Sequence, residues 1–337
     1  MNNFHYTKTQ DLKEAIGLAA ENKSAKFIAG GTNLIDLWKY DLVHFNSLLD
    51  INQNDSDIME TSDGGLRLSA FYTNADTAYH PLVEQRYPLL SKAILAGASA
   101  QIRNMATNGG NLLQRTRCYY FYDAATPCNK REPGTGCSAL NGINRIHAIL
   151  GSSPHCIAVF PSDMCVALSA LDARVNVSGI NGDRTIAFEN FHRLPGDTPE
   201  LDNTLLHDEI ITSIDLPPNN LNKNYSYLKL RDRNSYAFAL VSVAAAFDLE
   251  NNIIQEARIA LGGVAHKPWR NKAAEAFLQG KMATRENFAL AADIILAESV
   301  PYKYNSFKIE LGKRAIIRNC LMALDPDSQL PGAQPSK

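Results

Sequence analysis

The start of the chain alternates amphipathic and short apolar segments. In DLKEAIGLAAEN (11–22), apolar residues recur at helical spacing, and we expect Thr9 to cap this helix. A short apolar run (26–29) then predicts a strand that leads through a glycine pair into a second helix. HFNSLLDIN (44–52) and GGLRLSAFYT (64–73) predict further strands. The pattern therefore indicates mixed helices and sheets.

The rest of the chain divides into a longer and a shorter part. A helical pattern covers 81–99, and a strand, turn, helix and strand follow one another over 156–179. The strand 209–216 ends at two prolines and an Asn-rich stretch, which is the best linker candidate. Beyond it we expect strands joined by turns and then mainly helices. We therefore predict an α+β N-terminal region over 1–220, a smaller α+β domain over 221–325 and a disordered tail over 326–337.

The segment 115–156 interrupts this pattern, and we call it the cysteine segment. It has almost no regular element and holds four of the six cysteines: Cys118, Cys128, Cys137 and Cys156. Structural zinc sites usually rest on C-x-x-C pairs, which are missing here, whereas an iron–sulfur cluster accepts thiolates from a wider loop. The alternative is four unrelated cysteines that act as small hydrophobes, but such cysteines usually sit in regular core elements. We favour a metal site, whose charge nearby Arg115 and Lys130 would offset.

Composition narrows the class of protein. The 337 residues carry a formal net charge of −2, so no whole-protein field favours nucleic acid or anionic lipid. The N-terminal residues lack the basic and apolar regions of a signal peptide. The longest apolar run, 236–247, is too short to span a bilayer. We expect a soluble protein without a targeting signal of its own.

Two glycine-rich turns are candidate phosphate sites. In KFIAGGTNL (26–34), a strand runs into Gly-Gly-Thr and then a helix, which presents backbone N–H groups at a helix start. A plain strand-to-helix turn, which needs glycine for its own backbone, remains the alternative. ATNGGNLL (106–113) repeats the pattern, so the two turns could clamp one phosphate-bearing ligand from both sides. A G-x-G-x-x-A match at 134–139 lacks the preceding strand of a dinucleotide fingerprint, and we reject it.

The remaining polar candidates have ordinary structural explanations. Asp163 follows a Pro-Ser pair and could cap the next helix or contact a ligand, and capping is the simpler interpretation. Lys229 could reach solvent along its apolar stem. His155 stands beside Cys156 and could replace a cysteine as a ligand. No arrangement of acid, base and nucleophile indicates a catalytic site.

Five motifs in order give a resemblance to a known family: AGGTNL, RNMATNGGNL, PSDMCVALSALDA, LKLRDRNSYAFALVSVA and ALGGVAHKPWR. The series resembles the FAD-binding (medium) subunits of the xanthine dehydrogenase family of molybdenum hydroxylases. With the cysteine segment between the second and third motifs, it is similar to the flavin subunits with an extra [4Fe–4S] cluster, as in 4-hydroxybenzoyl-CoA reductases. The nearest resemblance is to the FAD subunits of bacterial periplasmic aldehyde oxidoreductases.

The resemblance implies a fold and a set of binding residues. The fold is a two-subdomain FAD-binding domain of the vanillyl-alcohol oxidase (PCMH) type, followed by a small α+β domain of the CO dehydrogenase flavoprotein C-terminal type. Asp163 would lie near the adenosine of FAD and Lys229 near the isoalloxazine. The four cysteines of the segment would hold the cluster. The two loops around the FAD pyrophosphate would consist of Lys26, Phe27, Ile28, Ala29, Gly30, Gly31, Thr32, Asn33 and Leu34, and of Thr107, Asn108, Gly109, Gly110 and Asn111.

The resemblance also implies electron transfer. An aldehyde would be oxidised at a molybdopterin in a large partner subunit, and electrons would pass through [2Fe–2S] clusters in a small subunit to FAD and an external acceptor. The chain would then be one member of a heterotrimer and need no catalytic residue of its own. Export on a partner's signal would place it in the periplasm, with the cytoplasm as the alternative. Two alternatives stay open: the same subunit in a 4-hydroxybenzoyl-CoA reductase or xanthine dehydrogenase-like enzyme, and a zinc-binding structural protein.

Overall fold

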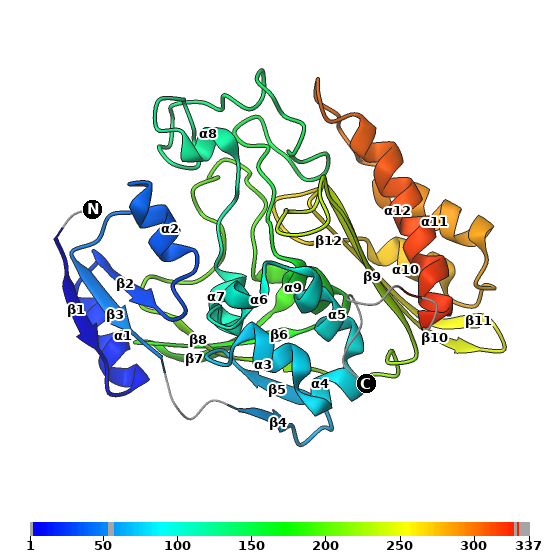
Figure 1. Ribbon diagram of the computed structural model, residues 1–337, viewed down its shortest axis with the longest axis horizontal. Coiled ribbons are helices and arrows are strands. Elements are labelled where there is room, and N and C mark those ends of the chain that lie inside the picture. Colours follow the sequence, from blue (N-terminus) through cyan, green and yellow to red (C-terminus); the bar gives the residue numbers. More distant parts are fainter. Residues whose placement is uncertain (1–2, 53–56, 327–328, 330–337) are drawn as a thin grey trace.

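The computed structural model describes residues 3–52, 57–326 and 329, and it begins with a small parallel sheet. The strand order is β1-β3-β2, and Figure 1 shows the sheet and its two helices in blue. Asp11, rather than the expected Thr9, caps the first helix, because its Oδ1 accepts the amide of Glu14 at 2.9 Å. The elements are β1 (His5–Lys8), α1 (Leu12–Glu21), β2 (Ala25–Ile28), α2 (Leu34–Lys39) and β3 (Ser47–Asp50).

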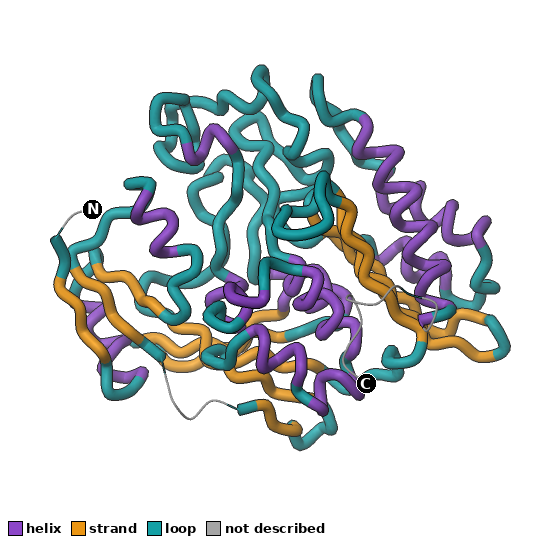
Figure 2. Tube along the Cα trace, viewed as in Figure 1, coloured by secondary structure: helices purple, strands orange, loops and turns teal. Residues whose placement is uncertain are grey.

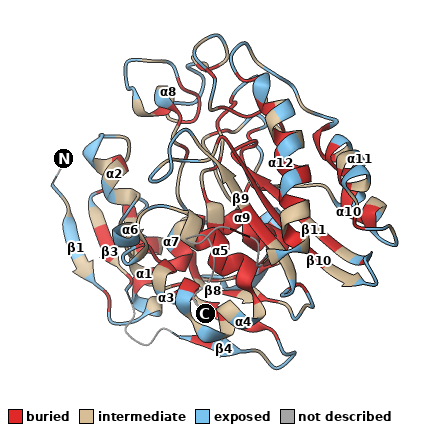
Figure 3. Ribbon diagram, turned by 45° about the vertical axis from the view of Figure 1, so that its right-hand side comes forward, coloured by how far each residue is buried: buried red, intermediate tan, exposed pale blue. Residues whose placement is uncertain are grey.

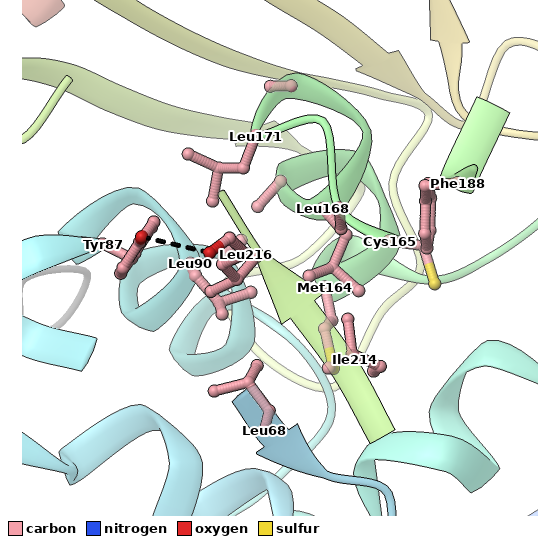
Figure 4. Packing of buried hydrophobic residues seen from close by; sticks show 14 of the residues in the cluster. Leu68, Tyr87, Leu90, Met164, Cys165, Leu168, Leu171, Phe188, Ile214 and Leu216 are labelled. Atoms are coloured by element: carbon pink, nitrogen blue, oxygen red, sulfur yellow. Dashed lines mark hydrogen bonds between the residues drawn. The ribbon is translucent and has the colours of Figure 1, made fainter. Parts of the chain in front are cut away.

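The second layer is an antiparallel sheet of five strands, in the order β4-β5-β8-β6-β7. They are β4 (Ile58–Glu60), β5 (Leu66–Ser69), β6 (Arg174–Gly179), β7 (Gly182–Ala187) and β8 (Ile210–Leu216). One face packs on helices, so that Leu68 and Ile214 meet Met164 and Leu168 (Figure 4). The helices of this part are α3 (Asn74–Tyr79), α4 (Pro81–Arg86), α5 (Pro88–Ala96), α6 (Ala100–Arg103), α7 (Asn108–Leu112), α9 (Asp163–Ala170) and the 3-10 turn η1 (Phe188–Asn190).

The third layer is an antiparallel sheet in the order β12-β11-β10-β9, with three helices on its outer face (Figure 2). Along β10, Val243, Ala245 and Phe247 pack against these helices, whereas Ala244 and Ala246 join the core around α5 and α9. Both faces are therefore buried (Figure 3), which explains the long apolar run in the sequence. The elements are β9 (Asn224–Leu230), β10 (Val241–Glu250), β11 (Ile253–Gly262), β12 (Trp269–Arg270), α10 (Lys272–Leu278), α11 (Arg285–Leu296) and α12 (Phe307–Leu324).

The cysteine segment lies at the top of Figure 1 and contains one short helix, α8 (Tyr119–Tyr122). Side chains satisfy its irregular backbone. Asn305 donates to the carbonyl of Ala148 at 3.0 Å, and the Lys308 Nζ donates to the carbonyl of His147 at 2.8 Å. The same Nζ also donates to the carbonyl of Gly263, which lies outside the segment, at 2.6 Å. Since Lys308 belongs to α12, the C-terminal domain fastens a segment more than a hundred residues away in the sequence.

Two further expectations concern the C-terminal tail and the possibility of a membrane-spanning helix. The predicted disordered tail falls mostly outside the described residues, but Gln329 is described, and its Nε2 donates to the carbonyl of Met322 at 2.8 Å. Within the described residues, no helix has the length and apolar character needed to cross a membrane.

Candidate cofactor-binding site

Two cavities meet at the first glycine loop. Cavity A, of about 440 Å³, is bordered by the whole stretch 26–34. Cavity B, of about 530 Å³, lies beyond the loop and extends to Asp163 and Lys229. Thr32, Asn33 and Gly110 border both cavities, so these residues form a waist between them. Each volume is that of a small-molecule site, and the pair suits a long ligand with two bulky ends.

The glycines at the waist let two loops touch through their backbones. A Cβ on Gly30 would lie 1.8 Å from the carbonyl oxygen of Met105, so only glycine fits there. Gly31 adopts φ +68°, a left-handed conformation that glycine enters without strain. Gly109 donates its amide to the carbonyl of Ala70 at 2.8 Å. Gly30 thus lets the first loop approach the start of the second loop, and the Gly109 bond fixes the second loop against Ala70.

The second loop meets the cavities through four of its five predicted residues. Thr107, Gly109 and Gly110 border cavity A, and Asn111 borders cavity B. Asn108 borders neither, contrary to the prediction. Its amide is fully buried, donating to the Ser69 carbonyl at 3.0 Å and accepting from Asn74 at 3.1 Å. Asn108 therefore positions the loop rather than contacting a ligand.

Asp163 and Lys229 meet at one end of the site. The Lys229 Nζ lies 2.7 Å from the Asp163 Oδ2, and both side chains are under 10% exposed. The hydroxyl of Tyr227 donates to the other carboxylate oxygen at 2.7 Å. The two residues therefore act together at cavity B, not at the opposite ends of FAD as the resemblance suggested. Ser162 caps α9 in place of Asp163, accepting the Cys165 amide at 3.0 Å.

Charged residues of both signs border cavity A, and Lys26 and Arg115 are the basic ones. Burial and then the charge of Arg115 lower the pKa of Lys26. The backbone amide of Arg115 also donates to the Asn33 Oδ1 at 2.8 Å, which ties the cysteine segment to the glycine loop. An anionic group in the cavity would favour the charged form of Lys26.

Asp202 connects the cavity with the cysteine segment, and nothing in its sequence context indicated this role. Its carboxylate lies 2.7 Å from the Arg115 Nε and 2.5 Å from the Lys130 Nζ. Burial opposes ionisation, but the charges of Lys130 and Arg115 outweigh it and lower the pKa of Asp202 to about 2. This carboxylate thus offsets one of the two positive charges that were expected to offset a cluster.

The four cysteines of the segment line one very small cavity. Burial raises the pKa of Cys118 to about 12 and that of Cys156 to about 11. Backbone N–H groups point at the sulfurs, such as the Ala158 amide 3.4 Å from the Cys156 Sγ. In the described parts of the chain, no three His, Cys, Asp or Glu side chains are arranged to hold a metal ion. The thiols thus converge without forming a site for one ion.

A histidine that sequence reasoning missed lies beside these four thiols. The His147 Nε2 lies 3.1 Å from the Cys118 Sγ, and the side chain is buried. His155, the candidate from sequence, lies with its Nε2 3.5 Å from an Asp197 oxygen and is half exposed. Because His147 stands 29 residues from Cys118 in an irregular stretch, no spacing rule connects the two.

Comparisons with known proteins give matches along nearly the whole chain. Residues 2–219 match the FAD binding domain in molybdopterin dehydrogenase, and residues 225–308 match the CO dehydrogenase flavoprotein C-terminal domain. The chain is 48% identical over 319 residues to the aldehyde oxidoreductase FAD-binding subunit PaoB of Escherichia coli, covering 94% of this chain and 96% of that one. The glyceraldehyde dehydrogenase medium chain of Sulfolobus acidocaldarius is 27% identical, with 82% of each chain covered.

Solved structures share the fold. A chain of quinoline 2-oxidoreductase from Pseudomonas putida 86 matches with a TM-score of 0.74 and 23% identity, covering 97% of this chain and 99% of that one. A chain of carbon monoxide dehydrogenase from Hydrogenophaga pseudoflava matches with a TM-score of 0.74 and 24% identity, covering 96% and 97%. At these identities the structural matches support the architecture alone.

Proposed function

Because this chain belongs to the FAD-binding medium subunits of the xanthine dehydrogenase family, we propose that it is the FAD and [4Fe–4S] electron-transfer subunit of a molybdenum-containing aldehyde oxidoreductase. The family and the α+β fold expected from the five motifs are thereby confirmed. The aldehyde substrate is proposed from the 48% identity to an aldehyde oxidoreductase subunit over nearly full length. The observation that carries the FAD site is the pair of cavities joined at Thr32, Asn33 and Gly110.

We place FAD in the two cavities in one direction. Its pyrophosphate would lie at the waist, where the glycine loops leave room for close approach, and Lys26 would face its charge. Cavity B would hold the isoalloxazine, because Arg117 borders that cavity and directly precedes Cys118. Cavity A would then hold the adenosine. Bound FAD supplies the exchange between two-electron and one-electron carriers, while the chain binds and orients it.

A [4Fe–4S] cluster is proposed for the four cysteines. A single zinc ion needs its thiolates about 2.3 Å from one point. A cubane instead gives each thiolate a different iron and so accepts ligands that stand further apart. The four thiols that line one cavity and the backbone N–H groups at sulfur support the proposal of a cluster.

The partners and the compartment follow from the same proposal. We expect a large molybdopterin subunit that oxidises the aldehyde and a small [2Fe–2S] subunit that passes electrons on, together forming a heterotrimer. The complex would reach the periplasm on a partner's export signal, with the cytoplasm as the alternative. With a different large subunit, the same chain would serve an enzyme whose substrate is an acyl-CoA or a purine.

Spectra and metal content test the proposal. The purified protein should show flavin bands together with broad iron–sulfur absorption, and about four irons but no zinc per chain. Cys128→Ala should lose most of the iron. Cys165→Ala is the matched control, because Cys165 is buried inside α9 and should leave iron unchanged. Purified protein without flavin or iron would refute the proposal, and full iron in Cys128→Ala would refute the ligand assignment.

A further inference from the structure

His147 is held with its ring against the sulfur of Cys118. Its side chain is 1% exposed, and its Nε2 lies 3.1 Å from the Cys118 Sγ. Its backbone is fixed separately: the carbonyl accepts from Lys308 at 2.8 Å, and the amide donates to the carbonyl of Asn144 at 3.0 Å. The ring takes no part in these backbone hydrogen bonds, so its Nε2 can form a hydrogen bond with the sulfur.

The proton on the ring has one favourable position. Among the described residues, the Nδ1 has no hydrogen-bond partner. A proton on Nδ1 would bury an unpaired donor, whereas a proton on Nε2 can point at sulfur. A cysteine that ligates iron is a thiolate and has no proton to give. With Cys118 as a ligand, the contact must be Nε2–H donating to Sγ.

Such a bond affects the two oxidation states of a cluster unequally. Reduction adds a negative charge that spreads onto the ligating sulfurs. A hydrogen-bond donor at sulfur therefore stabilises the reduced state more than the oxidised state. The effect is strong here, because the surroundings are buried and water cannot compete for the sulfur.

We propose that His147 is a positioning residue that donates its Nε2–H to the Cys118 thiolate and raises the reduction potential of the [4Fe–4S] cluster. This inference rests on the cluster of the proposed function. The bond favours electron acceptance by the cluster, so His147 helps to set how electrons divide between cluster and FAD. Ala158 donates a backbone amide to Cys156 at 3.4 Å, so His147 adds a side-chain donor at a different sulfur.

Redox titration followed by electron paramagnetic resonance tests the proposal. In the purified protein, His147→Leu removes the donor and keeps an apolar side chain, whereas His147→Gln keeps an amide donor. We expect His147→Leu to retain iron and FAD but to shift the reduction equilibrium roughly tenfold toward the oxidised cluster, about 59 mV lower for one electron. His147→Gln should recover much of the shift. An unchanged potential in an iron-replete His147→Leu protein would overturn the inference.

A second measurement needs no change at His147. Protein labelled with ¹⁵N-histidine, in a His155→Gln background, should show one nitrogen coupled to the reduced cluster in electron–nuclear double resonance. Lack of this coupling in protein that contains the cluster would overturn the role of His147 alone. Lack of iron in the unaltered protein would overturn the proposed cluster and this inference with it. Iron analysis thus separates the two failures.

Discussion

Gly30→Ala tests whether the contact between the two glycine loops sets FAD binding. The added Cβ would lie 1.8 Å from the Met105 carbonyl oxygen and 2.8 Å from its carbon. Contacts under 3.0 Å are not tolerated, so the loops must separate by 3.0 − 1.8 = 1.2 Å. Both groups are backbone, and no side chain can move aside instead. Overpacking of this kind costs about 1–3 kcal/mol of stability.

The effect on the cofactor follows from the same displacement. A shift of more than 1 Å removes one or two of the backbone hydrogen bonds that we expect the loop to give the pyrophosphate. Each hydrogen bond to a charged group contributes about 1.5–3 kcal/mol, so FAD should bind roughly 10- to 150-fold more weakly for each hydrogen bond lost. The assay is the FAD content of the purified protein and the FAD concentration needed to restore flavin binding to the stripped protein.

Gly17→Ala provides the matched control. Gly17 lies inside α1, and a Cβ there meets nothing within 4 Å. The same chemical change should leave FAD unaffected and stabilise the helix by up to about 1 kcal/mol. The reasoning would be refuted if Gly30→Ala bound FAD as tightly as the unaltered protein, or if both variants lost FAD equally.

Two further predictions concern buried charge. The pKa of Asp202 is near 3.8 in the unfolded chain and about 2 when folded. This difference stabilises the folded protein by about 2 kcal/mol above pH 4, and the stabilisation is lost as pH falls toward 2. Asp202→Asn should remove this acid dependence and cost about 3–5 kcal/mol at pH 7, since the buried Lys130 loses its carboxylate. Urea unfolding at pH 7 and pH 3 measures both effects, and an unchanged acid limb would contradict the assignment. The Lys92 Nζ has no hydrogen-bond partner among the described residues, and burial lowers the pKa of Lys92 to about 8. Lys92→Met should therefore raise stability by about 1–3 kcal/mol at pH 7. The gain should shrink between pH 8 and pH 10.5, because the folded protein holds Lys92 as a neutral amine and removing its proton costs less as the pH rises. A gain in thermal unfolding that stays constant with pH would argue against this cause.

The sequence predicted those parts of the molecule whose signal is local. The strand before Gly30 and the helices after residue 270 follow from periodicity, and the observed strand Ala25–Ile28 is displaced by one residue from the expected one. The cap of α1 was misplaced, because Thr9 bonds across the sheet to the carbonyl of Asp50 at 2.8 Å instead. Local patterns cannot distinguish a cap from such a partner.

The contacts that join distant segments were not predictable in this way. Asp202 forms its ion pairs only when the chain folds, because Lys130 and Arg115 lie 72 and 87 residues away in the sequence. Asn108 looked like a ligand residue because it lies within a glycine-rich motif, but side chains on α3 engage its amide. A motif identifies a loop, whereas tertiary packing decides which side chains of that loop face the cavity.

The fastening of the cysteine segment by Asn305 and Lys308 limits how this chain could be recombined with its relatives. Both side chains come from the part that follows the linker, yet they bond to carbonyls at 147 and 148, inside the insertion of the first domain. A chimera that exchanged the C-terminal domain for one without these two residues would deprive the carbonyls of residues 147 and 148 of these donors. The two domains of this protein are therefore expected to work best when exchanged together, although the linker between them looks like a natural point of exchange.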